Sequence, residues 1–335
     1  MLRKTPNIAI VGSTSLVGKE LRQMLEDSEF PVARVALFET EEYVGLLQEF
    51  AGEIQITHVI SPAAFDDIDI AFFACGPEIM DSYVASGGKF PGVTIDLTQT
   101  RRDGTIFVNG ISDPRSLPAQ GYFLNPHPAA IVISRMLSHL HNAFGLQSAA
   151  ITVLVPASDR GASGVDELQE QTVNLLNFQE IGSKVFSGQL AFNMLPEPRA
   201  SGQTETLILE QVQALGLSSP MPLIGVVQAP VFHSHAFSMF ARLAGEPSAE
   251  ALAEVLRQDH ANIMVHRPGT DLGDGPSPVS VVGSDKIHVG RIRRDANHSG
   301  AFSLWIAADN LRIAASNAIH MAERILFAPV APTEK

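Results

Sequence analysis

Cysteine is nearly absent from this chain of 335 residues, in which Cys75 is the only one. A single cysteine excludes an internal disulfide and any zinc site built from several thiolates, and it suits a reducing cytosol. Long apolar runs are absent too. None reaches the roughly 18 residues that a membrane-spanning helix needs, and the residues before Asn7 lack the apolar stretch of a signal peptide. We therefore expect a cytoplasmic protein with no membrane partner.

Basic residues are scarce. Lysine and arginine number 23 against 36 aspartates and glutamates, so the formal net charge is −13. This balance argues against nucleic acid as a partner, although an anionic nucleotide needs only a few local donors. Apolar residues make up 45% of the chain and charged residues 18%, which is ordinary for a globular protein. A chain of this length has room for two domains with substantial cores.

The first motif is a glycine turn. An apolar run over residues 7–11 predicts a strand, and the turn Gly12-Ser-Thr-Ser-Leu-Val-Gly18 separates it from a predicted helix. In a dinucleotide-binding fold, the first glycine makes the turn, a middle one lets the backbone approach a pyrophosphate, and the last lets helix pack on strand. Ser15 stands in the middle, so the motif predicts either a dinucleotide site or a tight connection without a ligand. The residues of such a site are Gly12, Thr14, Ser15, Leu16, Val17 and Gly18.

Acidic residues follow the next predicted strand, at 32–38. Glu39 to Glu42 lie about 20 residues beyond the glycine turn, where an acidic side chain can bond a ribose 2′-hydroxyl and repel a 2′-phosphate. If a dinucleotide binds, this segment favours NAD over NADP. The alternative is a solvated acidic loop.

Two further apolar runs, at 68–74 and 93–97, have the composition of strands buried on both faces of a parallel sheet. With the segments between them they predict a doubly wound α/β sheet. The carboxyl ends of such strands line a ligand crevice. Gly76 and Arg102, which follow the two strands, are therefore expected to face that crevice.

A strand-to-helix elbow is predicted over residues 121–131. Asn125-Pro126 favours a tight turn, and Pro128 suits the first turn of a helix. The helix dipole and the free N–H groups of such an elbow stabilise an anion, and a nucleophile could sit there. This elbow carries no nucleophile. His127 is either a base or weak nucleophile, or it caps the helix or bonds a carbonyl, and the second interpretation is the simpler one.

The rest of the chain predicts a second α+β block and a final amphipathic helix that packs back on the first sheet. The predicted elements are strands at 149–155, 222–232 and 286–292, a Gly/Ser-rich turn at 158–164, and helices from Val165, at 249–257 and at 310–326.

Several motifs carry a family resemblance: the Gly12–Gly18 turn, Asn125-Pro126, Ser158–Leu168, Phe192–Pro196, Pro230-Val231 leading to His235, Val289–Asp295 and Trp305–Ala315. Their order over nearly the whole chain resembles the aspartate-β-semialdehyde dehydrogenases. The resemblance implies a Rossmann-type dinucleotide-binding domain over 1–127 and 309–335, an α+β substrate and dimerisation domain over 128–308, and a C-terminal helix returning to the first domain. It also implies a homodimer and reversible, NADP-linked reductive dephosphorylation of aspartyl-β-phosphate.

The resemblance further implies a mechanism. The family uses a cysteine thiolate that forms a thioester, a histidine as acid and base, an arginine that binds the substrate carboxylate and a glutamine that orients the substrate. In register with Asn125-Pro126, the cysteine position falls on Pro128. The glutamine and arginine positions fall on Val155 and Gln228, so only the histidine, His235, is kept.

The binding positions implied by the resemblance are kept unevenly. Arg102 matches the phosphate-binding arginine, but no lysine or arginine occurs from Ser201 to Ala241. Asn310 matches the contact on the nicotinamide side, and its alternative role is helix capping. Ser158 and Gly76 are the other candidate cofactor residues.

Two further features could carry chemistry. Cys75 is either a displaced nucleophile or, more simply, a small buried hydrophobe. His233 and His235 are predicted to alternate on one strand and to face one side. Because no further ligand lies at metal spacing nearby, we expect no metal site.

The replaced positions predict a ligand-binding or regulatory homologue that lacks ordinary catalysis, similar to the Usg-type paralogues of the family. It would be a homodimer that binds NAD or NADP weakly, together with a small-molecule ligand. The alternative is an active NAD(P)-dependent oxidoreductase in amino-acid biosynthesis, acting on aspartate-β-semialdehyde or on another aldehyde or acyl phosphate. A third interpretation is a subunit that forms mixed dimers with an active paralogue.

Overall fold

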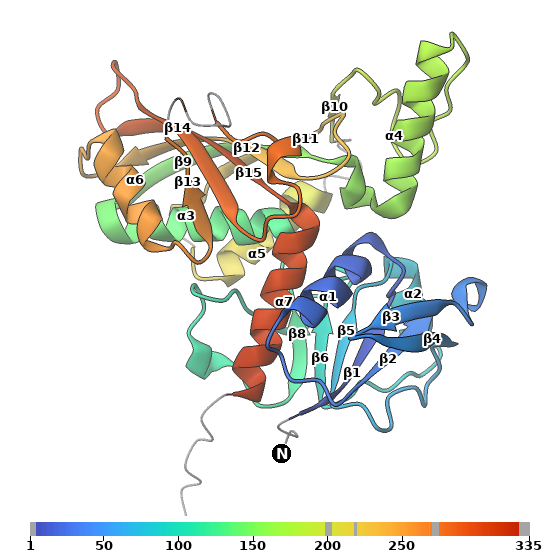
Figure 1. Cartoon of the computed structure of the whole chain (residues 1–335). Helices are drawn as coiled ribbons and strands as arrows, with labels where there is room; N and C mark the ends of the chain where they lie inside the picture. Colours follow the sequence, from blue (N-terminus) through green and yellow to red (C-terminus); the bar gives the residue numbers. More distant parts are fainter. Residues whose placement is uncertain (1–4, 198–202, 218–219, 268, 270–274, 328–335) are drawn as a thin grey trace, which may run out of the picture. The chain divides into compact units, whose positions relative to one another are not determined.

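A computed structural model describes residues 5–197, 203–217, 220–267, 269 and 275–327. The chain divides into two compact units. Of these residues, 5–126 and 314–327 form the first unit, and those between 127 and 313 form the second (Figure 1). The predicted α/β architecture, with a doubly wound first sheet and a C-terminal helix, is confirmed.

The first unit contains a sheet of eight described strands in the order β3-β4-β2-β1-β5-β6-β8-β7. Every neighbouring pair is parallel except β3 and β4, which form an antiparallel hairpin. The strands are β1 (Asn7–Val11), β2 (Arg34–Glu39), β3 (Leu47–Phe50), β4 (Glu53–Val59), β5 (Ile70–Phe73), β6 (Val93–Asp96), β7 (Thr105–Ile106) and β8 (Gly121–Leu124). The helices are α1 (Leu16–Asp27), α2 (Pro77–Ala85), the 3₁₀ turns η1 (Glu41–Tyr43) and η2 (Pro114–Ser116), and most of α7 (Asn310–Leu326).

The central strands are buried on both faces because nearly every residue in them is apolar. Side chains alternate along β1: Ile8 and Ile10 join a core with α1 and α7, whereas Ala9 and Val11 join a core with α2. Helix α7 therefore covers the same face as α1, as predicted for the last helix. Its Asn317 fixes it there, because the Nδ2 atom donates 3.0 Å to the Phe107 carbonyl.

The second unit contains a sheet of seven described strands in the order β10-β11-β9-β12-β15-β14-β13. Helices α3, α5 and α6 pack on it and on one another (Figure 1). The strands are β9 (Leu146–Val155), β10 (Leu195–Pro196), β11 (Leu223–Gln228), β12 (His235–Leu243), β13 (Ile263–Val265), β14 (Ile287–Arg294) and β15 (Ala301–Ala308). The helices are α3 (Pro128–Phe144), α4 (Gly161–Leu176), α5 (Gln203–Ala214), α6 (Ala249–Gln258) and the 3₁₀ turns η3 (Ala157–Arg160) and η4 (Val279–Val281).

Two local predictions in this unit are wrong. The Gly/Ser-rich segment at 158–164 is not a turn that precedes a helix from Val165, because η3 occupies its first part and α4 already begins at Gly161. Gly164 explains this: a Cβ there would lie 2.3 Å from the Ala157 carbonyl oxygen, so the small residue lets the helix pack closely. His233 and His235 do not alternate on one strand, because Ser234 has φ +73° and β12 begins only at His235.

Candidate functional site

The predicted elbow is present. β8 ends at Leu124, and α3 begins at Pro128 with His127 as its N-cap. The His127 ring caps the helix, as its simpler interpretation proposed, because Nδ1 accepts a 3.2 Å hydrogen bond from the Ala129 N–H. Pro128 fills the first helical position, where a missing N–H does no harm. The position that the family resemblance gives to a nucleophile is therefore a helix start with no reactive side chain.

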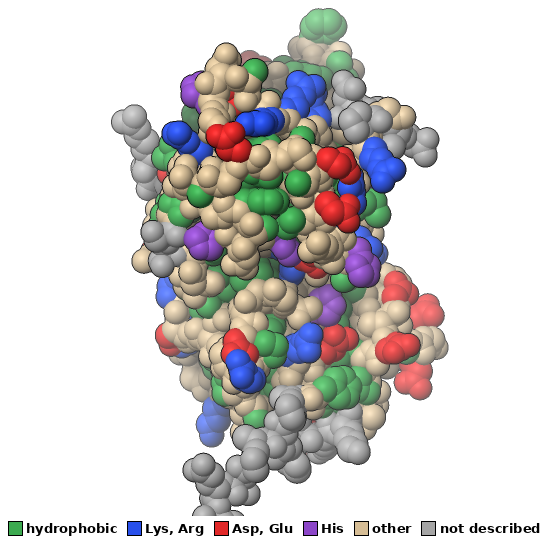
Figure 2. Space-filling view, turned by 90° about the vertical axis from the view of Figure 1, so that its left-hand side faces the viewer, with side chains coloured by type: hydrophobic (Ala, Val, Ile, Leu, Met, Phe, Trp, Pro, Cys, Tyr) green, Lys and Arg blue, Asp and Glu red, His purple; other side chains and the backbone are tan. Residues whose placement is uncertain are grey.

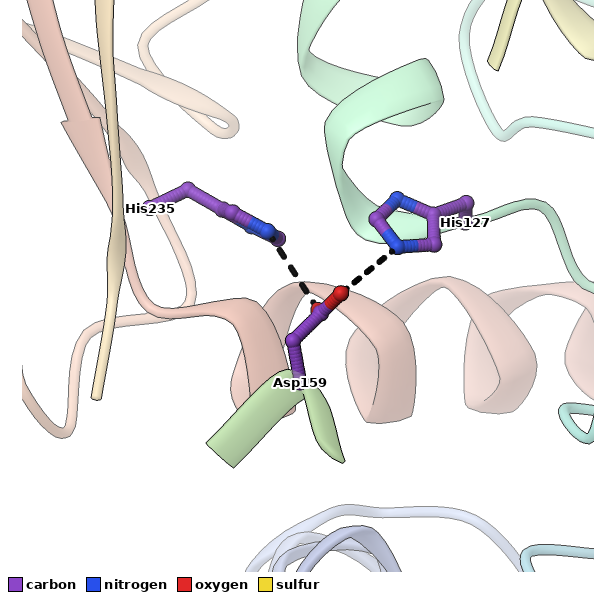
Figure 3. A group of neighbouring side chains, drawn as sticks. All are labelled: His127, Asp159 and His235. Carbon is purple, nitrogen blue, oxygen red and sulfur yellow. Dashed lines mark hydrogen bonds and ion pairs between the residues drawn. The ribbon is translucent and has the colours of Figure 1, made fainter. Parts of the chain in front are cut away.

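Three ionisable side chains of the second unit meet beside this elbow (Figure 3). Asp159, in η3, lies between the two histidines. Its Oδ2 is 3.2 Å from His127 Nε2, and its Oδ1 is 3.3 Å from His235 Nε2. His235, the first residue of β12, has an exposed fraction of 0%, and His127 of 6%. Each of the three offers one metal-ligand atom, and these atoms lie within 4.8 Å of one another.

The charges in this cluster follow from burial and contact. Burial alone would raise the pKa of Asp159, but the contacts with His127 and His235 outweigh it and hold that pKa well below the usual range. Burial lowers the pKa of His235, and this outweighs the opposing effect of Asp159. The cluster is therefore a carboxylate held beside a neutral His235 ring.

Some polar atoms of this region lack a hydrogen-bond partner among the described residues. They are Nδ1 of His233, Oγ of Ser234, and both ring nitrogens of His235, whose 3.3 Å contact with Asp159 is long for a hydrogen bond. A buried polar atom without a partner costs about 1–3 kcal/mol. Such atoms are uncommon in native structures, where water or a ligand usually satisfies them.

The two predicted cofactor residues of the second unit lie side by side and buried. Asn310 Nδ2 donates 3.1 Å to Ser158 Oγ, and Asn310 Oδ1 accepts a 3.0 Å hydrogen bond from the Ser234 N–H. Asn310 thus ties together the segments that carry Asp159 and His235. Asp309, rather than Asn310, caps α7, because its Oδ1 accepts hydrogen bonds from the Leu311 and Arg312 N–H groups in the first turn of the helix.

The family resemblance gives the position of the substrate-binding arginine to Gln228, whose side chain is uncharged and already hydrogen-bonded. Gln228 is buried at the end of β11, and its Nε2 donates 2.8 Å to the Val155 carbonyl of β9. Val155, to which the family resemblance gives the position of the orienting glutamine, is buried in the core. Neither residue supplies a positive charge for a carboxylate.

In the first unit, the glycine turn has the close packing typical of a dinucleotide fold. Gly12 has φ +83°, and a Cβ there would lie 2.5 Å from the Cα of Cys75. A Cβ on Gly18 would lie 2.0 Å from the Gly12 carbonyl oxygen. Ser15 acts as the N-cap of α1, since its Oγ accepts from the Gly18 N–H at 2.9 Å and donates to the Ala74 carbonyl at 2.6 Å. Its side chain is therefore turned into the fold.

Glu39 does not belong to a solvated loop. It is buried at the end of β2, and its Oε1 accepts hydrogen bonds from the Thr14 N–H at 2.6 Å and from the Ser13 hydroxyl at 3.0 Å. Glu41 and Glu42 are exposed in η1. The alternative of a solvated acidic loop therefore holds for those two residues, but not for Glu39.

The other candidates of the first unit are placed as follows. Cys75 is buried below the glycine turn, and burial raises the pKa of its thiol far above the usual range, so the thiolate is disfavoured. Gly76 is the N-cap of α2. Arg102 is exposed, and its Nη1 donates 2.7 Å to the Gln99 carbonyl.

Two family models match this chain, one in its N-terminal part and one in its C-terminal part. Residues 7–112 match the model described as semialdehyde dehydrogenase, NAD binding domain, and residues 137–313 match semialdehyde dehydrogenase, dimerisation domain. The fold and these matches define a two-domain member of the semialdehyde dehydrogenase family. A membrane span would need a longer apolar helix than any in the described part of the chain.

Comparison with individual proteins and solved structures identifies the family more closely. An aspartate-semialdehyde dehydrogenase of Rickettsia conorii is 30% identical over 337 residues, covering 97% of this chain and 99% of the relative. A crystal structure of aspartate semialdehyde dehydrogenase II from Vibrio cholerae, complexed with ASA, superposes with a TM-score of 0.86 at 27% identity, covering 97% of this chain and 99% of that one. A probable aspartate-semialdehyde dehydrogenase from Pseudomonas aeruginosa gives a TM-score of 0.85 at the same identity and coverage. The chain belongs to the aspartate-semialdehyde dehydrogenase family.

Sequence reasoning identified His127 and His235 separately but missed Asp159, which joins them. The available signal was an acidic residue directly after Ser158, at the start of a helix that follows a strand. Acidic residues are common at such positions because they complement the helix dipole. Nothing local in the sequence marked this one as a partner of the two histidines.

Proposed function

We propose that this protein is a ligand-binding or regulatory paralogue that lacks the thioester chemistry of its family, as in the Usg-type branch. The proposal is carried by Pro128, which starts α3 where the family resemblance gives the nucleophile, in a chain whose single thiol is buried. Loss of a covalent nucleophile alone costs several orders of magnitude in rate. The uncharged Gln228 removes the clamp for the substrate carboxylate as well, so two requirements of the reaction fail together.

The glycine turn supports dinucleotide binding. Gly12 and Gly18 are packed too tightly for any side chain, as the close approach of turn and helix requires. Glu39 would accept a hydrogen bond from the ribose 2′-hydroxyl and would repel a 2′-phosphate, so NAD is favoured over NADP. Because Ser15 replaces the glycine that admits a pyrophosphate, we expect weak binding. A bound nicotinamide would supply a hydride acceptor or donor.

The sheet of the second unit supports a homodimer. On β12, Phe237 and Met239 point into the core, whereas Phe240 on the opposite face is 57% exposed in the single chain. Large exposed aromatic side chains on a sheet are typical of an interface.

Acidic and basic side chains, red and blue in Figure 2, lie interspersed on the face shown there, so its described residues form no continuous basic surface for nucleic acid. We place the protein in the cytoplasm, with a small molecule as ligand.

A second candidate function is an active NAD-linked oxidoreductase that acts on aspartate-β-semialdehyde or another aldehyde without a covalent intermediate. The contact between Asp159 and His235 favours it, because a carboxylate beside a histidine is a common acid–base arrangement. A subunit that forms mixed dimers with an active paralogue is the third candidate. Purification from the native host would separate it from the first two, since only this candidate predicts a co-purifying homologue.

Binding and turnover together test the main proposal. Calorimetric titration should give saturable binding of NAD, and phosphate-dependent oxidation of aspartate-β-semialdehyde should be absent. Failure to bind either dinucleotide would contradict cofactor binding. Turnover that His235→Ala abolishes would contradict the loss of catalysis and favour the oxidoreductase.

A further inference from the structure

We propose that Asp159 fixes the tautomer of His235 and so leaves His235 Nδ1 as a buried hydrogen-bond acceptor for the donor group of a small polar ligand. In this arrangement Asp159 is a positioning residue, and His127 holds Asp159 in place. The inference concerns the site of the proposed function and rests on that function for its ligand. Its test reads proton positions rather than turnover or dinucleotide binding, so either proposal can fail without the other.

The backbone sets the proton of His127. Its Nδ1 faces the Ala129 N–H at 3.2 Å and can only accept there. In a neutral imidazole, one ring nitrogen donates and the other accepts. The proton of His127 is therefore on Nε2, where it points at Oδ2 of Asp159, 3.2 Å away.

Asp159 then sets the proton of His235. The carboxylate is ionised and nearly buried, so it accepts hydrogen bonds but donates none. A lone pair on His235 Nε2, 3.3 Å from Oδ1, would face the negative charge and be repelled in this water-poor setting. An N–H at that position is attracted instead. This attraction places the proton of a neutral His235 on Nε2 and the lone pair on Nδ1, although the 3.3 Å contact does not have the geometry of a hydrogen bond.

His235 Nδ1 has no partner among the described residues, although the side chain is completely buried. With the proton on Nε2, this atom is an unsatisfied acceptor. It would be satisfied by a hydroxyl or an ammonium group of a ligand. This gives the site a chemical preference for a hydrogen-bond donor, and a basic atom to receive a proton from it.

A metal ion on the same three residues fits less well, even though two histidines and one carboxylate are a common ligand set. Metal binding needs lone pairs on both Nε2 atoms. The other ring nitrogen of a metal-bound histidine then carries a proton and donates it to a carbonyl, a carboxylate or water. Nδ1 of His127 faces an N–H, which cannot accept. The backbone at Ala129 thus favours the carboxylate-bridged arrangement.

Nitrogen NMR of the free protein labelled with ¹⁵N-histidine tests the proposal, because ring nitrogens with and without a proton give distinct shifts. His127→Gln and His235→Gln assign the two residues. We expect both to be Nε2–H tautomers at neutral pH. A His235 that is protonated on both nitrogens, or on Nδ1 alone, would overturn the proposal. So would zinc or another transition metal at one equivalent per chain in the purified protein.

The same NMR measurement on Asp159→Asn provides a second test. The new amide can accept from His127, whose tautomer the backbone fixes, and must then present its NH₂ group to His235 Nε2. The shifts of Nδ1 and Nε2 of His235 should interchange, while those of His127 stay. Asp259→Asn is the matched control, since Asp259 Oδ2 lies 2.9 Å from His139 Nε2 in the same unit. It should leave His235 unchanged. Unchanged ¹⁵N shifts of His235 in Asp159→Asn would contradict the role of Asp159. If that variant does not fold, the tautomer of His235 in the native protein still tests the proposal.

Discussion

The carboxylate of Glu39 accepts a 2.6 Å hydrogen bond from the backbone N–H of Thr14, across 25 residues of sequence. The acidic residue at the end of β2 is thereby held against the glycine turn. Gln48 extends the contact, because its Nε2 donates 2.8 Å to the Ser13 hydroxyl. This network places one negative charge where a dinucleotide fold recognises the adenosine ribose.

Glu39→Gln should shift the dinucleotide preference. Glutamine keeps an acceptor for the Thr14 N–H but removes the charge that repels a 2′-phosphate, so NADP should bind more tightly relative to NAD. We expect the ratio of the two dissociation constants to change by about tenfold, as for one charge contact worth about 1.4 kcal/mol. Calorimetric titration with both dinucleotides measures it. Glu41→Gln, an exposed change in η1, is the control and should leave the ratio as it is. An unchanged ratio in Glu39→Gln would remove Glu39 from cofactor selection.

His288 should make the fold less stable in mild acid. Burial, with smaller contributions from His266 and Lys286, lowers the pKa of His288 to about 4, whereas an unfolded histidine titrates near 6.5. Between these values the unfolded chain binds the additional proton, so this contribution to stability is complete above about pH 6.5 and is lost as the pH falls towards 4.

Urea unfolding at a series of pH values measures this effect. We expect about 1–3 kcal/mol of the acid-induced loss in unfolding free energy to disappear in His288→Asn. His58→Asn, at an exposed position on β4, should keep the full loss. Equal pH profiles for the native protein and His288→Asn would show that His288 is not the group responsible.

Phe240→Asp should dissociate the proposed homodimer. Phe240 projects from the face of β12 opposite to Phe237 and Met239, and it is 57% exposed in the single chain. A carboxylate there would have to lose its water in a dimer that uses this face, and it could not replace the apolar contact of the aromatic ring. Light scattering after size exclusion should give the mass of one chain. Ile54→Asp, at a 64% exposed position on β4 in the first unit, should remain dimeric. A dimeric Phe240→Asp would place the interface elsewhere.

The periodicity of the sequence predicted the parallel sheet, the elbow and the last helix because these depend on local pattern. The last helix was predicted at 310–326, and α7 has these bounds. The β3–β4 hairpin was missed, because its strands are largely exposed and Ile54 and Ile56 face solvent rather than the core. The start of α4 was misplaced, because tight packing at Gly164 outweighs the turn preference of a Gly/Ser-rich segment.

The site was harder to predict than the fold. The elbow could be predicted from the sequence, and Pro128 at the cysteine position is what the family resemblance implies. The hydrogen bond between His127 and Asp159 spans 32 residues. The contact between Asp159 and His235 depends on the backbone at Ser234, whose positive φ precedes His235 at the start of β12. Such contacts arise from tertiary packing, which no short stretch of sequence encodes.

The central claim is that this family member has lost thioester catalysis, and phosphate-dependent oxidation of aspartate-β-semialdehyde tests it most directly. The protein should be produced in a host that lacks its own enzyme and assayed with NAD and NADP separately, beside an active family member. The account predicts no dinucleotide reduction above the blank, because Pro128 offers no nucleophile. Reduction that scales with protein concentration and disappears in His235→Ala would contradict it, and Cys75→Ser and His127→Gln would then identify the residue that has taken over.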